Sequence, residues 1–123
     1  MPSPSVTIAS RGVERVLSGH VWIYRADVRD ASEAGPGDVV RVLDARKRFW
    51  GQALYSSQSQ IALRLVTRER RPFDKAFLAE RIGAAAAFRE QVVEGAQAYR
   101  LVAAEGDLLP SLTVDRYGEC LVI

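Results

Sequence analysis

The residues of this sequence with the clearest chemical potential are basic and occur in short clusters. Residues 46–48 read Arg-Lys-Arg, and three of the four residues from 68 to 71 are arginines. A guanidinium group is planar, so it binds phosphate through two parallel hydrogen bonds and stacks on nucleobases. The clusters therefore favour a partner that carries phosphates, although a general preference for arginine over lysine would also produce them.

A polar loop provides a second set of candidate ligands. Residues 56–60 read Ser-Ser-Gln-Ser-Gln, and Arg64 follows in the next predicted strand. Amide and hydroxyl groups hydrogen-bond phosphate, ribose and base edges. Two interpretations stay open: the loop is only solvated, or Gln58, Gln60 and Arg64 belong to a nucleic-acid face.

His20 is the single histidine and lies in the segment SGHVWIY at 18–24. No serine, cysteine or carboxylate partner is indicated for it, which argues against a general base. The alternative places Trp22 and Tyr24 inside the fold, with His20 as a half-buried hydrogen-bonding residue.

Other reactive side chains have structural interpretations. Glu105 and Asp107 are expected to pair with Arg100 or Arg116 rather than to act as a catalytic carboxylate pair. Cys120 lacks the basic neighbours that would activate a thiol, so it is expected to pack within a strand. No catalytic residue is predicted.

Several classes of site are disfavoured by composition. One cysteine and one histidine provide neither an intrachain disulfide nor a Cys/His zinc site. No apolar run approaches a membrane span, and the start of the sequence lacks a signal-peptide pattern. The expectation is a cytoplasmic protein without metal. Gly35-Pro36-Gly37 leads into a strand rather than a helix, so no cofactor-binding glycine loop is predicted here.

Net charge divides the chain. Residues 1–71 carry twelve Lys and Arg against seven Asp and Glu, a net charge of +5, whereas residues 72–123 carry five against eight, a net charge of −3. The basic half is therefore the candidate phosphate-binding part.

Short strands dominate the elements that must position these residues. The patterns predict strands at 6–8, 20–24, 38–44, 49–55 and 61–67, extended chain resuming at 27–28, and a helix at 11–18 that ends at Gly19. In the strand 61–67, alternation is expected to point Ile61, Leu63 and Leu65 inward and Ala62, Arg64 and Val66 outward. These elements predict a small β-barrel with one short helix.

A long helix opens the remainder. Residues 73–94 form this helix, with Asp74 as N-cap, a contact between Phe73 and Leu78, and Gly95 as the stop. Its expected inner face consists of Phe77, Leu78, Ile82, Ala85, Phe88 and Val92. A strand at 99–103, a loop at 105–110 and a hairpin with its turn at 115–118 follow. The predicted class is α+β, and the apolar final strand suggests the front part of a longer protein.

Three segments together resemble a known family. SGHVWIY at 18–24, GQALYSSQSQIALR at 51–64 and YRLVAAEGDLLPSLTVDRYG at 99–118 resemble bacterial class I S-adenosylmethionine-dependent methyltransferases that make 5-methylcytosine in large-subunit rRNA. The sequence departs from the family at Leu108 and Ser111, where members tend to have glycine.

The resemblance implies a division of the chain and a role for it. Residues 1–68 would be a PUA-like RNA-binding domain, 69–98 a connecting region with the long helix, and 99–123 the truncated start of a central α/β domain. S-adenosylmethionine and the catalytic cysteine would belong to a domain outside this sequence. The implied partners are ribosomal RNA and, in a homodimer, a second copy. The candidate RNA-binding residues are Arg11, Arg15, His20, Arg46, Lys47, Arg48, Gln58, Gln60 and Arg64.

Two other functions remain open. The barrel and helix would form an assembly module of the same enzyme, or the chain would be a stand-alone PUA-type RNA-binding protein. Phosphate contacts weaken steeply with salt, whereas an apolar interface does not, so salt dependence separates RNA binding from assembly.

Overall fold

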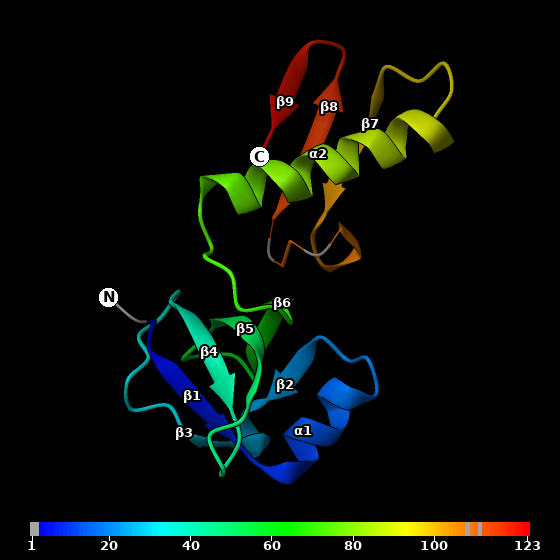
Figure 1. Ribbon diagram of the computed structural model, residues 1–123. Helices are drawn as coiled ribbons and strands as arrows, with labels where there is room; N and C mark the ends of the chain where they lie inside the picture. Colours follow the sequence, from blue (N-terminus) through cyan, green and yellow to red (C-terminus); the bar gives the residue numbers. More distant parts are fainter. Residues whose placement is uncertain (1–2, 108, 111) are drawn as a thin grey trace. The chain divides into compact units, whose positions relative to one another are not determined.

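The computed structural model describes residues 3–107, 109–110 and 112–123 of the chain. Leu108 and Ser111 lie outside the described residues. The chain folds as two compact units, Met1–Arg71 and Pro72–Ile123, and each is described by itself. Figure 1 labels their elements.

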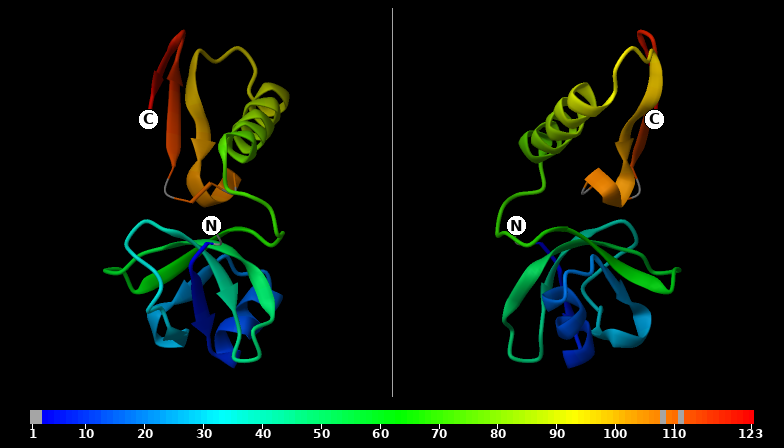
Figure 2. Two further views of the ribbon diagram at one scale, coloured as in Figure 1. Left: turned by 60° about the vertical axis from the view of Figure 1, so that its left-hand side comes forward. Right: turned by 90° about the vertical axis from the view of Figure 1, so that its right-hand side faces the viewer.

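The first unit is a curled sheet with one short helix. Its elements are β1 (Ser5–Ile8), α1 (Ser10–Leu17), β2 (Trp22–Tyr24), the 3₁₀ turn η1 (Arg25–Asp27), β3 (Val28–Asp30), β4 (Val39–Leu43), β5 (Phe49–Tyr55) and β6 (Ile61–Thr67). The strand order is β2-β6-β5-β4-β1-β3, antiparallel except for the parallel pair β1 and β4. Only η1 separates the two edge strands in sequence, so the sheet curls into a small barrel (Figure 2).

Backbone hydrogen bonds at η1 hold this closure. The N–H of Arg25 donates to the carbonyl of Gln60 at 2.8 Å, and the N–H of Ala9 donates to the carbonyl of Asp27 at 2.7 Å. The barrel encloses one apolar core, to which Val6, Ile23 and Val40 each contribute a fully buried side chain.

Alternation fails in β6 because of two bulges. Ala62 lies at the shift in register between β6 and β2, and Val66 lies at the shift in register between β6 and β5. A bulge residue resets which face the following side chains occupy. The expectation that Ala62 and Val66 point outward is therefore wrong, since both are buried, as is Leu63.

The predicted inward placement of two aromatic side chains in the first unit is also wrong. Trp22 and Tyr24 point out of the barrel with 38% and 37% exposure, because Ile23 between them fills the core. At the end of α1, Val16 is buried in the core and Leu17 is 69% exposed.

The second unit is a helix packed on a small antiparallel sheet. It contains α2 (Lys75–Val92), β7 (Ala98–Ala103), the 3₁₀ turn η2 (Ala104–Asp107), β8 (Thr113–Tyr117) and β9 (Cys120–Val122), in the strand order β7-β8-β9. The carboxylate of Asp74 caps α2 by accepting the N–H of Phe77 at 3.0 Å, as predicted. Leu78 and Ile82 of α2 pack against the cluster that includes Val102.

Parts of this unit differ from expectation. Phe88 and Val92 are 53% and 58% exposed, so the apolar face of α2 ends earlier than predicted. The ring centres of Phe73 and Phe77 lie 5.2 Å apart, a contact that the sequence pattern did not predict. The hairpin turn falls after Tyr117, because the residues from Thr113 to Tyr117 extend β8.

The predicted α+β class is confirmed, with a barrel and short helix followed by a long helix and a strand hairpin. Among the described residues, no helix has the length and apolarity needed to cross a membrane.

Candidate nucleic-acid interface

The Arg-Lys-Arg cluster forms the tip between β4 and β5 and is organised by Asp44. This carboxylate is 5% exposed. It accepts the backbone N–H groups of Arg46 and Arg48 at 2.8 and 3.0 Å, the Arg48 Nε at 2.6 Å and the Trp50 indole Nε1 at 3.0 Å. Lys47 takes φ 62°, which closes the tight turn. All three basic residues of the tip are exposed, and Arg48 is also fixed by its ion pair with Asp44.

The same contacts determine the charge of Asp44. Desolvation raises the pKa of Asp44, but the hydrogen bonds from Arg48, Trp50 and Arg46 outweigh it and hold that pKa well below its ordinary value. Asp44 is therefore ionised at neutral pH, and the cluster keeps its shape.

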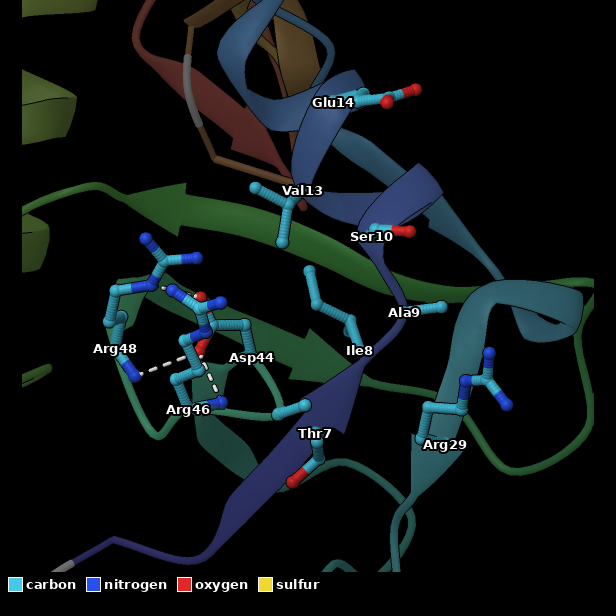
Figure 3. Close-up of a pocket in the computed structure, with 11 residues that line it drawn as sticks. Thr7, Ile8, Ala9, Ser10, Val13, Glu14, Arg29, Asp44, Arg46 and Arg48 are labelled. Carbon is cyan, nitrogen blue, oxygen red and sulfur yellow. Dashed lines mark hydrogen bonds and ion pairs between the residues drawn. The ribbon is translucent and has the colours of Figure 1, made fainter.

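An open groove of about 730 Å³ lies beside this tip. Its sides come from the β4–β5 tip, from β1 with the start of α1, and from Arg29 of β3. Figure 3 shows Arg46 and Arg48 on one side, Arg29 on the other, and Ile8 and Val13 between them. The groove therefore places guanidinium groups on both flanks of an apolar floor.

Arg11 and Arg15 on α1 lie around a buried acid. Asp27 is 2% exposed. Its Oδ1 accepts the Nε of Arg11 at 2.7 Å, and its Oδ2 lies 3.5 Å from the Nε of Arg15. The Arg15 guanidinium also lies 4.9 Å from the centre of the Tyr24 ring. Both arginines thus hold α1 against the barrel while part of each remains accessible, with 64% and 36% side-chain exposure.

A second candidate surface, the β2–β6 face, combines aromatic and basic side chains. Trp22 pairs in register with Arg64 across the two strands, and Tyr24 lies on the same outward side of β2 as Trp22. His20 is exposed just before this strand, which contradicts the half-buried placement. Sequence patterning missed the outward aromatic pair because a three-residue strand does not reveal which side is buried.

The polar loop between β5 and β6 is held by an arginine that sequence reasoning did not select. The guanidinium of Arg25 donates to the carbonyl oxygens of Ser56 and Ser59, with two bonds of 3.0 and 2.8 Å to Ser59. Gln58 and Gln60 remain exposed. The loop is thus fixed in shape while its amide groups face solvent.

The nine predicted residues therefore belong to separate places on the first unit. Arg46 to Arg48 lie at the β4–β5 tip, Gln58 and Gln60 in the β5–β6 loop, and Arg64 opposite Trp22. Arg29 joins the groove without any sequence signal, because a lone arginine in a short strand has no distinguishing pattern.

In the second unit, Asp107 has a different partner from the arginines predicted for it. Asp107 accepts both Nη groups of Arg89, at 3.0 and 2.8 Å, and also the N–H of Ala103 at 2.6 Å. Desolvation raises the pKa of Asp107, but Arg89 and the Ala103 N–H bring it below its usual range. Arg100 instead pairs with Asp115 at 2.8 Å.

Other reactive groups suggest no further chemistry. Cys120 is exposed, so its predicted packing role is wrong. Within the described ranges, no group of three or more His, Cys, Asp or Glu side chains is placed to hold a metal ion.

Comparison with known proteins adds sequence and fold relationships. A family model described as a PUA-like domain matches residues 6–68. The chain is 38% identical over 117 residues to "Ribosomal RNA large subunit methyltransferase I" of Shewanella denitrificans, covering 90% of this chain and 30% of that protein. A protein of the same name from Tolumonas auensis is 36% identical over 125 residues, covering 98% of this chain and 31% of that protein.

A solved structure shares the fold. SMU.776, described as a candidate methyltransferase and solved in complex with SAH, superposes with a TM-score of 0.83 at 18% identity, covering 96% of this chain and 31% of that one. The chain thus spans about 30% of the length of the curated relatives it matches.

Proposed function

Because the match over residues 6–68 makes this chain a member of the PUA-like domain family, we propose that it binds RNA for a larger S-adenosylmethionine-dependent methyltransferase. The proposed reaction of the whole protein is transfer of a methyl group to cytosine C5 in large-subunit rRNA. The observation that carries the proposal is the similarity over nearly the whole chain to proteins named as rRNA large-subunit methyltransferases. Fold and charge are compatible with it, since the barrel belongs to the half with a net charge of +5.

The proposal assigns the RNA contacts to exposed and half-buried side chains of the barrel. Arg46 and Lys47 would meet phosphates at the β4–β5 tip, and Gln58 and Gln60 would hydrogen-bond ribose or base edges. On the β2–β6 face, Trp22 and Tyr24 offer rings on which unpaired bases stack, beside Arg64. Arg11, Arg15, His20 and Arg48 complete the proposed set.

The proposed division of labour places the chemistry outside this chain. Residues 1–68 would hold RNA, 69–98 would connect, and 99–123 would begin a central domain. S-adenosylmethionine would be bound by the methyltransferase domain, since no glycine-rich loop leads from a strand into a helix among the described residues. A protein with this role acts on ribosomal RNA in the cytoplasm.

Binding of a large-subunit rRNA fragment at several salt concentrations tests the proposal. Arg64→Ala and Gln60→Ala should each weaken binding, and Arg64→Ala should also reduce the slope of log K against log salt by about one unit. Lys75→Ala, an exposed change of equal charge in the second unit, is the control. Failure of the unmodified chain to bind RNA at any salt concentration would refute the proposal.

Assembly is a second candidate function, favoured by one observation. Leu121, Val122 and Ile123 expose 57%, 57% and 87% of their surface in and just after β9. Contiguous exposed apolar side chains on an edge strand favour pairing with a further strand, which the larger protein or a second copy in a homodimer would supply. Sedimentation would then reveal a dimer that persists at high salt, and charged substitutions at Leu121 or Val122 should dissociate it.

A further inference from the structure

From the groove between the β4–β5 tip and Arg29, we infer a binding site for a single unpaired nucleotide of an RNA strand. This inference rests on the proposed RNA-binding function, which it makes more specific. It concerns residues other than those of the β2–β6 face, because no residue of β2 or β6 lines the groove.

Size and lining fit one nucleotide better than a duplex. A volume of about 730 Å³ falls within the range of roughly 300–1,000 Å³ for small-ligand sites. The floor is apolar, with Ile8 and Val13 lying between the two arginine flanks (Figure 3). An unpaired base can cover such a floor, whereas a base within a duplex is already stacked on its neighbours.

Charge in the groove favours a phosphate. The side chains of Arg29 and Arg46 make no hydrogen bond or ion pair with any other group in the part of the chain that the structure describes. Their donors are therefore available to a ligand. Asp44 does not cancel them, because its oxygens are occupied by Arg48, Trp50 and two backbone N–H groups. Two available guanidinium groups on opposite flanks suit a sugar-phosphate backbone that crosses the groove.

One acid restricts the ligand. Glu14 of α1 also lines the groove and is exposed. A carboxylate repels a second phosphate but accepts hydrogen bonds from a ribose hydroxyl or a base amino group. The groove thus combines donors for phosphate, an acceptor for sugar or base, and an apolar floor for the ring.

Two RNA duplexes that differ by one bulged uridine test the site directly. The unmodified chain should bind the bulged duplex about tenfold more tightly than the blunt duplex, a typical effect of one or two charge-assisted contacts. Arg29→Ala should abolish this preference and reduce affinity for the blunt duplex by less than about twofold. Replacing the bulged uridine with an abasic unit should keep the phosphate contact and lose only the part of the preference that the base supplies.

The controls separate the possible failures. Arg29 is exposed on β3, so thermal unfolding should show Arg29→Ala folded, and Lys75→Ala should keep the full preference for the bulge. Equal binding of the two duplexes, or a preference that survives Arg29→Ala, would overturn the groove assignment while the proposed RNA binding stands. No binding of either duplex would overturn both. Micromolar binding of free uridine 5′-monophosphate that leaves RNA binding unchanged would assign the groove to a free nucleotide and refute the inference.

Discussion

Replacing Gly51 with alanine should destabilise the first unit strongly. Gly51 has φ 148°, a backbone conformation that side chains disfavour, and a Cβ there would lie 2.7 Å from the carbonyl oxygen of Thr67. That oxygen belongs to the neighbouring strand β6, whose position is fixed by pairing with β5. Neither strand can move without breaking ladder hydrogen bonds.

The expected size of the effect follows from these two costs. The disfavoured backbone conformation costs on the order of 1–3 kcal/mol, and forcing an extra methyl group into packed structure costs about as much again. A unit of this size has a stability of roughly 4–10 kcal/mol. Gly51→Ala should therefore remove about 3 kcal/mol or more and lower the melting temperature by at least about 12 °C.

Fluorescence isolates this effect, because both tryptophans of the chain, Trp22 and Trp50, lie in the first unit. Gly83 in the middle of α2 is the matched control, since a Cβ there meets nothing within 4 Å. Gly83→Ala should stabilise the second unit by about 0.5–1 kcal/mol, and circular dichroism at 222 nm measures this change. A tryptophan transition that moves by less than about 3 °C in Gly51→Ala would refute the reasoning.

Other features give further expectations. The pKa of Asp44 is lowered on folding, so its contribution to stability is present above its unfolded pKa of 3.8 and is lost as pH falls toward the folded value. Acid titration followed by tryptophan fluorescence should show this loss of stability. In Asp44→Asn, the stability of the first unit should depend less on pH over the same range. Arg89→Ala breaks the two-bond ion pair with Asp107 and should reduce the stability of the second unit by about 2 kcal/mol. The midpoint of thermal unfolding by circular dichroism should fall, while the tryptophan transition of the first unit stays in place. An unchanged circular-dichroism midpoint would show that the ion pair does not stabilise the second unit. Cys120 is exposed and should react with a thiol reagent in the folded chain nearly as fast as in urea, whereas protection would contradict its exposure. Calorimetry with S-adenosylmethionine should show no binding by this chain, and micromolar affinity would contradict the assignment of that site to another domain.

Sequence patterning succeeded where local chemistry decides the structure. Asp74 caps α2 as predicted, because an acidic residue before a helix satisfies free N–H groups whatever the tertiary context. Val40 and Val42 are buried at alternating positions of β4, as a regular strand requires.

Sequence patterning failed where residues distant in the sequence determine which face of a strand is buried or which side chains pair. The bulges at Ala62 and Val66 arise from register with β2 and β5, which the composition of β6 does not reveal. The partner of Asp107 is Arg89, 18 positions earlier in the chain and on a helix, whereas the sequence suggested a nearer arginine. The groove depends on the same kind of long-range placement, since β1 brings Arg29 and the β4–β5 tip to its two sides.

The place of β1 in the barrel affects how the protein can fold during synthesis. β1 pairs with β3 and, in parallel, with β4, so its neighbours are made later than β1 itself. Val6 and Ile8, which are buried in the finished barrel, have no complete partner surface until residues up to Leu43 have left the ribosome. At roughly 5–20 residues per second, β1 waits about two to seven seconds in each round of translation before both of its partner strands have been made. The buried face of β1 is thus completed only by strands that are synthesised after it.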